Sequence, residues 1–233
     1  MRRCLMIVVK EPVVGQVKTR LAASVGAAYA LALYEAFVAD TIATAGTVPG
    51  ADLGLGFWPP SAHAYFRTLC PHAVLFPQRG ADLGERLLNA FEQAHAARYE
   101  QCVVMSSDSP NVPAAYLRRA FALLDDASVV LGPCEDGGYY LIGMHEPQPA
   151  LFGGITWSTE VVYRQTVERA AEAELRLATL PVWYDIDTVA DLTRLRADLA
   201  KEPGAVPDAT LAVLNHMVLP AAHTYEEVEK GHA

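Results

Sequence analysis

The sequence predicts an α/β protein with a mostly parallel, mixed β-sheet, and three observations support this fold class. Short, continuous apolar runs alternate with longer segments of helical periodicity along nearly the whole chain. Runs such as residues 4–9 (CLMIVV) contain no polar side chain, which is typical of strands covered on both faces. Of the 233 residues, 52% are hydrophobic, which is enough to fill one large core. We therefore expect a three-layer α/β/α architecture.

Glycine and proline residues delimit the elements expected in the first half of the chain. Gly26 precedes an Ala-rich segment with apolar residues at helical spacing, and Gly46 ends it as a C-cap would. Pro59-Pro60 ends the apolar run over residues 53–58. The other segments follow from their apolar periodicity. In this half the expected strands are 4–9, 53–58 and 74–76, and the expected helices are 27–46, 61–69 and 83–98.

Turn and capping signals delimit the second half. Pro113 stands where the first turn of a helix begins, and the EDGG sequence at 135–138 is a turn between two apolar runs. Thr188 and Asp191 have the spacing of a capping box for the last helix. Here the expected strands are 102–105, 128–131, 139–144 and 177–182, and the expected helices are 114–124, 160–173 and 189–200. Because the sequence has no repeat and no long linker, we expect one domain over residues 1–200 and a C-terminal extension, not a separate domain, over 201–233.

Composition and charge exclude several classes of protein. The chain has 18 Lys and Arg against 27 Asp and Glu, a net charge of −9, and such an acidic protein repels the phosphates of nucleic acid. No apolar run approaches the roughly 20 residues of a membrane span, and the N-terminal run stops at Lys10, too early for a signal peptide. The four cysteines and seven histidines have no metal or redox spacing. We expect a reduced, cytoplasmic protein with no nucleic-acid or membrane partner, and the oligomeric state stays open.

A cluster of cations follows the first apolar run. Ligands of open α/β sheets bind beyond the carboxyl ends of the strands, so polar residues at these points are candidates for a site. The segment KEPVVGQVKTRL brings Lys10, Gly15, Lys18 and Arg20 into one strand-to-helix connection. Such a loop can surround phosphate oxygens with cations and backbone N–H groups. The alternative is a solvated basic loop, and the GxxxxGK[ST] pattern of a P-loop is absent.

Acidic residues follow the later apolar runs. Asp108, in SSDSP, is placed either to hold a hard cation such as Mg²⁺ or to form an Asx-turn or helix cap. Asp185 and Asp187 point to the same side, and either supplies a second metal ligand or caps the following helix. Glu135 and Asp136 either bind hydroxyl groups or a metal, or belong to a hairpin turn. Four loops with phosphate- or metal-compatible chemistry together indicate a ligand site.

These motifs, taken together, resemble a known family. VVKEPVVGQVKTRL, SSDSP, GPCEDGGYYLIG, the WST turn and DIDTVADL resemble a bacterial family of GT-A-fold, glycosyltransferase-like proteins over residues 4–196. The N-terminal motif is also similar to that of 2-phospho-lactate guanylyltransferase and, more distantly, of the molybdenum cofactor nucleotidyltransferases. All belong to the nucleotide-diphospho-sugar transferase superfamily. The resemblance implies a GT-A fold and a transferase activity.

The resemblance also implies roles for individual residues. Asp108 and Asp187 match the acids that bind the metal, Mg²⁺ or Mn²⁺, and Asp108 is a catalytic residue together with Lys18 and Arg20. Read from the sequence alone, Trp157 to Thr159 could equally be a helix start with a packed indole. The residues expected to hold the nucleotide are Lys10, Gly15, Lys18, Arg20, Gly80, Asp82, Leu83 and Arg86. Those expected to face the acceptor are Glu135, Asp136, Gly137, Gly138, Tyr139, Trp157, Ser158 and Thr159.

The expected function is metal-dependent transfer from a nucleotide donor to a small-molecule acceptor. The leading form is nucleotidyl transfer from a nucleoside triphosphate to a phosphorylated or hydroxylated acceptor, because the cations and Mg²⁺ together match the charge of a triphosphate. The alternative is glycosyl transfer from a nucleotide sugar, although Asp108 is followed by Ser109-Pro110 and the Asp-x-Asp mark of glycosyltransferases is missing. A third reading is a nucleotide-binding module without catalysis.

Overall fold

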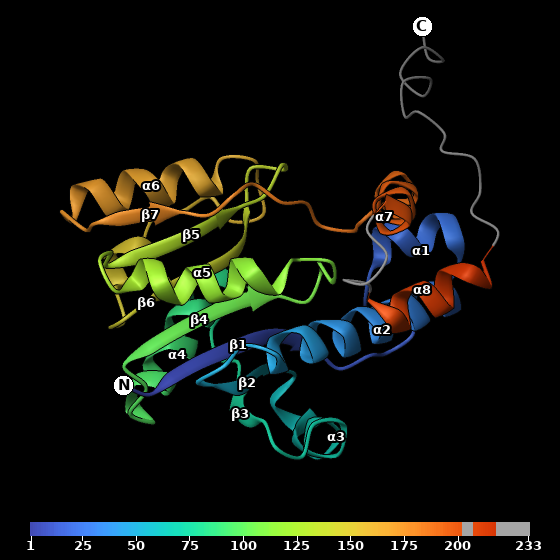
Figure 1. Cartoon of the computed structure of the whole chain (residues 1–233), viewed down its shortest axis with the longest axis horizontal. Coiled ribbons are helices and arrows are strands. Elements are labelled where there is room, and N and C mark those ends of the chain that lie inside the picture. The colour runs from blue at the N-terminus through green and yellow to red at the C-terminus, as the bar shows by residue number, and fades with distance from the viewer. Residues whose placement is uncertain (202–206, 218–233) are drawn as a thin grey trace, which may run out of the picture.

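A seven-stranded mixed sheet, in the order β3-β2-β1-β4-β6-β5-β7, forms the middle layer of the molecule (Figure 1). The computed structural model describes residues 1–201 and 207–217, and all statements below refer to them. The strands are β1 (Arg3–Lys10), β2 (Ala51–Trp58), β3 (Val74–Pro77), β4 (Gln101–Ser106), β5 (Val129–Pro133), β6 (Tyr139–Met144) and β7 (Leu177–Thr179). The predicted α/β fold class with a mixed sheet is confirmed.

Helices cover both faces of this sheet. Helices α2, α3 and α5 contribute apolar side chains to the core on one face, and α4 and α6 to the core on the other. Figure 1 shows α5 in front of the sheet and α4 behind it. The helices are α1 (Thr19–Val25), α2 (Ala27–Gly46), α3 (His63–Leu69), α4 (Leu83–Ala96), α5 (Ala114–Leu124), α6 (Val162–Glu172), α7 (Val189–Lys201) and α8 (Asp208–Asn215), with 3₁₀ turns η1 (Pro60–Ala62) and η2 (Pro149–Leu151).

The register of the strands brings several loops to one edge of the sheet. β1 runs parallel to β2 and β4, so that Lys10 pairs with Trp58, and Val8 pairs with Ser106 near the carboxyl ends. β6 is antiparallel to β4 and β5, and its first residue, Tyr139, therefore reaches the same edge. Residues that follow β1 and β4 consequently meet the turn that precedes β6.

Two elements differ from the sequence expectation. The strand predicted over 177–182 ends at Thr179; beyond it the pairing with β5 is irregular, and only Leu180 and Trp183 donate main-chain hydrogen bonds, to the oxygens of Leu131 and Pro133. The predicted loop before Gly26 contains the short helix α1, whose Leu21 is fully buried. The strongly periodic segments, in contrast, agree with the predicted helices to within one or two residues at most ends.

A third apolar cluster joins α1, α2, α7 and α8 at one end of the molecule (Figure 1). On α2, Asp40 accepts hydrogen bonds from the main-chain N–H groups of Ala209 and Thr210, at 3.0 and 2.7 Å, and so caps α8. The fully buried side chains of this cluster include Leu21, Leu33, Leu195 and Leu214. The predicted extension 201–233 thus contributes to the core over 207–217. Its residues 202–206 and 218–233 lie outside the described part.

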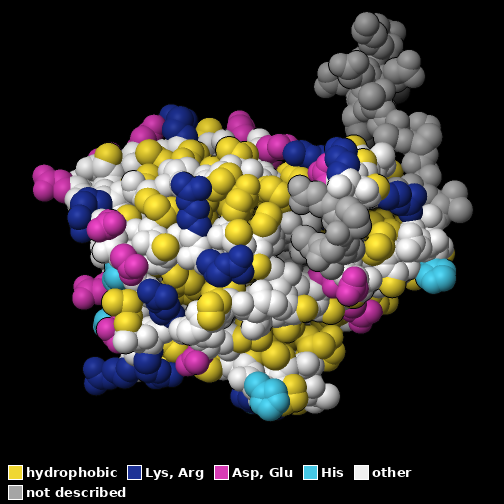
Figure 2. Space-filling view, in the orientation of Figure 1, with side chains coloured by type: hydrophobic (Ala, Val, Ile, Leu, Met, Phe, Trp, Pro, Cys, Tyr) yellow, Lys and Arg dark blue, Asp and Glu magenta, His cyan; other side chains and the backbone are white. Residues whose placement is uncertain are grey.

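Charge is dispersed on the face of the molecule that α2 and α5 cover. Figure 2 shows the face covered by α2 and α5, where Lys and Arg side chains are interspersed with Asp and Glu and no continuous stripe of one sign is visible. Among the described residues, no helix has both the length and the apolar character that a membrane span requires.

Candidate active site

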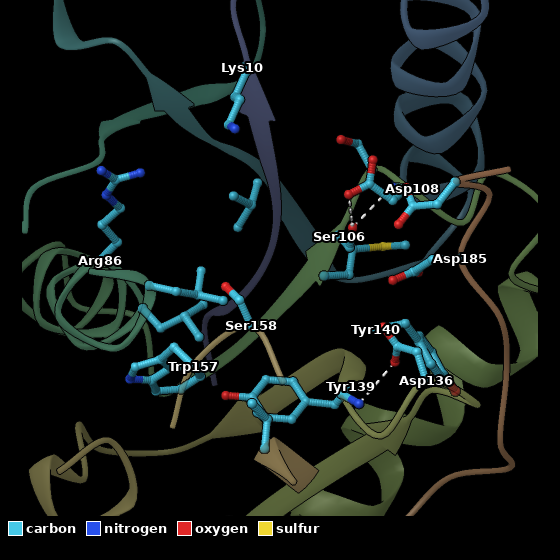
Figure 3. A pocket seen from close by; sticks show the side chains of 18 of the residues that line it. Lys10, Arg86, Ser106, Asp108, Asp136, Tyr139, Tyr140, Trp157, Ser158 and Asp185 are labelled. Atoms are coloured by element: carbon cyan, nitrogen blue, oxygen red, sulfur yellow. Dashed lines mark hydrogen bonds between the residues drawn. The ribbon is translucent and has the colours of Figure 1, made fainter. Parts of the chain in front are cut away.

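A cavity of about 950 Å³ opens at the edge of the sheet where β1 and β4 end. Figure 3 looks into this cavity and shows that side chains from distant segments converge there. A volume of this size is typical of small-molecule and cofactor sites. The predicted site residues that line it are Lys10, Lys18, Arg20, Asp82, Leu83, Arg86, Asp108, Asp136, Gly138, Tyr139, Trp157, Ser158, Thr159 and Asp187.

Lys18 connects the two predicted metal ligands. Its Nζ lies 2.6 Å from Asp108 Oδ1 and 2.9 Å from Asp187 Oδ1, and its side chain is only 4% exposed. Burial lowers the pKa of Lys18, but the two carboxylates outweigh burial and hold this pKa above its ordinary value, so the ammonium is charged. The backbone of Lys18 is left-handed, with φ at 46°, a strained conformation for a residue with a Cβ. The two ion pairs offset this strain.

The carboxylates have further partners. Ser106 Oγ donates to Asp108 Oδ2 at 3.1 Å and accepts from the Asp108 main-chain N–H at 2.9 Å. Arg20 donates to Asp187 Oδ2 at 3.3 Å. Burial raises the pKa of Asp108, but the charge of Lys18 and the hydrogen bonds bring it below its ordinary value. The cluster therefore pairs two carboxylates with two cations.

Asp185 adds a third carboxylate beside this cluster. Ser109 Oγ donates a hydrogen bond to Asp185 Oδ1. Burial, followed by the charge of Asp108, raises the pKa of Asp185 to about 6. The sequence offered Asp185 and Asp187 as alternatives, and the structure brings both to the cavity.

Asp108 and Asp187 have the chemistry of ligands for a divalent cation, but in this structure both carboxylates are paired with Lys18. Carboxylate oxygens are the ligands that Mg²⁺ and Mn²⁺ prefer. The ammonium of Lys18 takes the position between Asp108 and Asp187. Over residues 1–201 and 207–217, no three or more His, Cys, Asp and Glu side chains are grouped so as to hold a metal ion. A divalent cation between these two acids therefore requires Lys18 to move towards another anion, such as a phosphate.

Two further cations line the wall across the cavity from Asp108, as Figure 3 shows for Lys10 and Arg86. The guanidinium carbon of Arg86 lies 4.3 Å from the ring centre of Trp58, and its Nε donates to the main-chain oxygen of Gly80 at 3.2 Å. Arg86 is thus held in place by an aromatic face and a carbonyl group. Nearby, the Asp82 carboxylate accepts from the Glu85 main-chain N–H at 2.8 Å and caps α4.

The remaining wall is made by the turn between β5 and β6 and by the segment before α6. Tyr163 N–H donates to the Gly137 main-chain oxygen at 2.8 Å, which ties the two segments together. Gly137 has φ at 86°, and a Cβ there would clash with the main chain of Glu160, so glycine is required. Trp157 packs against Gly84 on α4, where a Cβ would collide with the indole. The wall is therefore rigid.

Four predicted residues do not line the cavity: Gly15, Gly80, Glu135 and Gly137. Glu135 instead forms a two-bond ion pair with Arg194, at 2.6 and 2.8 Å, and so does not face the expected acceptor position. Gly80 and Gly137 act through their main chains, as described above. The pairing of Glu135 depends on a residue far along the chain, which sequence spacing does not reveal.

The cavity lining also includes residues that the sequence did not single out, among them Tyr34, Gln78, Ser106 and Glu160. Gln78 follows β3 directly and Ser106 ends β4. A polar residue at the carboxyl end of a strand is a signal of a ligand site, and this signal is present at both positions. Tyr34 lies on α2, and its hydroxyl accepts from the Lys10 main-chain N–H at 2.7 Å. Burial raises the pKa of Tyr34 to about 12. In the sequence, the helical spacing of Tyr34 with its apolar neighbours indicates a core position and gives no sign of a role in the site.

Comparison with known proteins identifies the family. The model of a family described as "uncharacterized protein conserved in bacteria (DUF2064)" matches residues 41–159, about half of the chain. The chain belongs to this family. A solved structure from Desulfovibrio desulfuricans, described as a "putative nucleotide-diphospho-sugar transferase", is 36% identical to this DUF2064 protein, with a TM-score of 0.86. The match covers 93% of this chain and 95% of that chain.

More distant solved structures share the fold of the DUF2064 chain. A 4-diphosphocytidyl-2C-methyl-D-erythritol synthase from Anaerococcus prevotii has a TM-score of 0.58 at 9% identity, over 85% of this chain and 96% of that one. A CMP:2-keto-3-deoxy-manno-octonic acid synthetase has a TM-score of 0.52 at 12% identity, over 86% and 99%. A comparison with curated proteins gave no significant match. The predicted resemblance to the nucleotide-diphospho-sugar transferase superfamily is confirmed by the relative from Desulfovibrio and the shared fold.

Proposed function

We propose that the chain catalyses metal-dependent nucleotidyl transfer from a nucleoside triphosphate to a small acceptor. The observation that supports this best is the cluster of Lys18 and Arg20 with Asp108 and Asp187, which opens into the cavity. The description of the 36% identical relative supports the transferase class.

The charges of the cavity suit a triphosphate. Lys10, Lys18, Arg20 and Arg86 line it, and a triphosphate gives Lys18 an anion to bind other than the carboxylates. Asp108 and Asp187 would then be free to hold Mg²⁺ or Mn²⁺ through their oxygen atoms. Cations that are already fixed in a cavity stabilise phosphate charge without a reorganisation cost during the reaction.

The reaction needs no covalent nucleophile. The bound metal would stabilise the charge of the leaving pyrophosphate. An acceptor oxygen forms a bond to the α-phosphorus, the bond from this phosphorus to the bridging oxygen breaks, and pyrophosphate leaves. The proton of the acceptor passes to a carboxylate of the cavity, for which Asp136 and Asp185 are available. Lys18 and Arg20 stabilise the charge at phosphorus, and positioning supplies much of the rate.

Glycosyl transfer is the second candidate, because the relative from Desulfovibrio is described as a nucleotide-diphospho-sugar transferase. Product analysis separates the two activities. The full chain is incubated with each nucleoside triphosphate or nucleotide sugar, Mg²⁺ or Mn²⁺, and a panel of acceptors. Pyrophosphate from a triphosphate supports the proposal, and nucleoside diphosphate from a nucleotide sugar contradicts it in favour of glycosyl transfer. Nucleotide binding without either product supports a binding module.

A variant control links the product to the site. Asp108→Asn keeps the shape of the side chain and removes its charge, so pyrophosphate release should fall by about 100-fold or more. Asp126→Asn, in the exposed turn after α5 and outside the cavity, is the matched control and should retain full activity.

A further inference from the structure

Charge is divided unevenly between the two halves of the cavity. Among the described lining residues, the Lys and Arg side chains come from β1, from the loop and helix that follow it, and from α4; they are Lys10, Lys18, Arg20 and Arg86. The wall formed by the β5–β6 turn, β6 and the segment 157–162 contributes Asp136 and Glu160 and, within the described chain, no Lys, Arg or His. Figure 3 shows Lys10 and Arg86 across the cavity from Asp136.

Two cations on segments that adjoin this acidic wall are already engaged. Arg194 forms its two-bond pair with Glu135, and its guanidinium carbon lies 3.7 Å from the ring centre of Tyr184. Arg164, on α6, pairs with Glu168 at 3.1 Å. Asp136 accepts a hydrogen bond from the Gly138 main-chain N–H at 2.9 Å, which does not neutralise its charge. Within the described chain, Asp136 and Glu160 thus line this wall without a Lys or Arg partner.

The other groups of this wall suit hydroxyl compounds. Tyr139 and Trp157 contribute aromatic surface, and Ser158 and Thr159 contribute hydroxyl groups. Ionised carboxylates only accept hydrogen bonds, so they pair with hydroxyl donors. A phosphate group placed here would stand beside Asp136 and Glu160, and no described Lys, Arg or His side chain of this wall would offset the repulsion.

We propose that the acceptor is a hydroxyl compound without a phosphate group, such as a neutral sugar or polyol, whose hydroxyl groups bind Asp136 and Glu160. This inference rests on the proposed nucleotidyl transfer and selects the hydroxylated class of acceptor over the phosphorylated one. One hydroxyl oxygen of the acceptor becomes bonded to the α-phosphorus, pyrophosphate leaves, and the product is a phosphodiester. The hydroxyl proton passes to a carboxylate of the cavity.

The test uses a phosphate ester as a probe of the acidic wall. The full chain is saturated with a non-hydrolysable triphosphate analogue and Mg²⁺, so that the phosphates of the analogue occupy the cationic half. Glucose 6-phosphate and glucose are then titrated by calorimetry. We expect no saturable binding of glucose 6-phosphate to the wild type. Glu160→Lys should raise the affinity for this ester at least about tenfold.

Two controls keep the proposal falsifiable. Glu168→Lys makes the same charge change on α6 outside the cavity and should not raise the affinity. Asp136→Asn, which retains an acceptor for the Gly138 N–H group, replaces Glu160→Lys if that variant does not fold. Wild-type protein that binds glucose 6-phosphate more tightly than glucose would overturn the proposal, and so would an affinity that neither variant changes. Failure of the analogue to bind contradicts the proposed function instead, which a separate titration of the analogue reveals first.

Discussion

Lys18 is the residue on which the charge balance of the site depends. It lies between Asp108 and Asp187 with only 4% of its side chain exposed. Without Lys18, both carboxylates would lose the positive charge that they share. The sequence identified all three residues, because each follows an apolar run. It did not predict that the lysine would take the position between the two acids, since this contact joins residues 169 positions apart.

Replacing Lys18 with methionine should destabilise the protein and free Asp108 and Asp187 to bind the proposed metal ion. Asp108 and Asp187 would lose their shared cation, and the free energy of unfolding should fall by about 2–3 kcal/mol, less than for a wholly buried pair because both acids keep contact with solvent. Mg²⁺ should raise the Tm of this variant more than that of the wild type, because it can take the place of the ammonium. Thermal unfolding with and without Mg²⁺ measures both effects.

The control is Lys10→Met, which removes an exposed cation of the same cavity. Its Tm should respond to Mg²⁺ as that of the wild type does. If Mg²⁺ raises the Tm of the wild type and of Lys18→Met equally, Lys18 does not prevent Asp108 and Asp187 from binding the metal ion.

Asp185 predicts a pH dependence of stability. Its pKa is raised from 3.8 to about 6 in the folded protein, so the folded state binds this proton more tightly than the unfolded state. The stabilising contribution of the bound proton is complete below the ordinary pKa and is lost as the pH rises through 6. Asp185→Asn should therefore be more stable than the wild type at pH 7.5 by about 2 kcal/mol, and about equally stable below pH 4. Denaturant unfolding at the two pH values measures this. If the free energies of unfolding of Asp185→Asn and the wild type differ by the same amount at both pH values, the raised pKa of Asp185 is contradicted.

At the scale of elements, the presence of all seven strands was predictable from the sequence, whereas helices α1 and α8 were not predicted. Continuous apolar runs and capping signals indicate β1, β4 and α7 because these depend on local sequence. Helices α1 and α8 are short, and their buried Leu21 and Leu214 are stabilised by contacts with other elements. The same limit applies to Glu135, to which the family resemblance gave an acceptor-binding role and which pairs with Arg194 outside the cavity lining.

The capping box of α7 links this helix to the site. Asp191 Oδ2 accepts from the main-chain N–H groups of Asp187 and Thr188 at 3.0 and 2.7 Å, as the spacing of Thr188 and Asp191 predicted. Asp191→Ala should lower the free energy of unfolding by about 1–2 kcal/mol. It should also weaken the binding of triphosphate with Mg²⁺, because Asp187 loses its main-chain anchor.

The conservative variant Asp191→Asn retains one acceptor oxygen and should lie between the wild type and Asp191→Ala in both calorimetry and thermal unfolding. Reduced stability with unchanged nucleotide affinity would show that the cap does not position Asp187.

At the scale of the whole molecule, the predicted boundary near residue 200 divides a shared core. Helix α8 packs on α2, Asp40 caps it, and Leu214 is fully buried. A chain that ends at Lys201 should therefore have a free energy of unfolding lower by at least about 3 kcal/mol, and Leu214→Ala alone should account for about 2–3 kcal/mol. Denaturant unfolding of both measures this, and a shortened chain as stable as the full one would contradict a structural role for α8.

The net charge of −9 is compatible with an anionic ligand because four Lys and Arg side chains line the cavity in which we propose that a triphosphate binds. Calorimetric titration of the full chain with nucleoside triphosphates and the corresponding nucleosides, in the presence of Mg²⁺, tests this most directly. For at least one base, the triphosphate should bind about 100-fold or more tightly than the nucleoside, and Lys18→Met should remove most of this difference. Equal affinities of the wild type for triphosphate and nucleoside would contradict a triphosphate site built around Lys18.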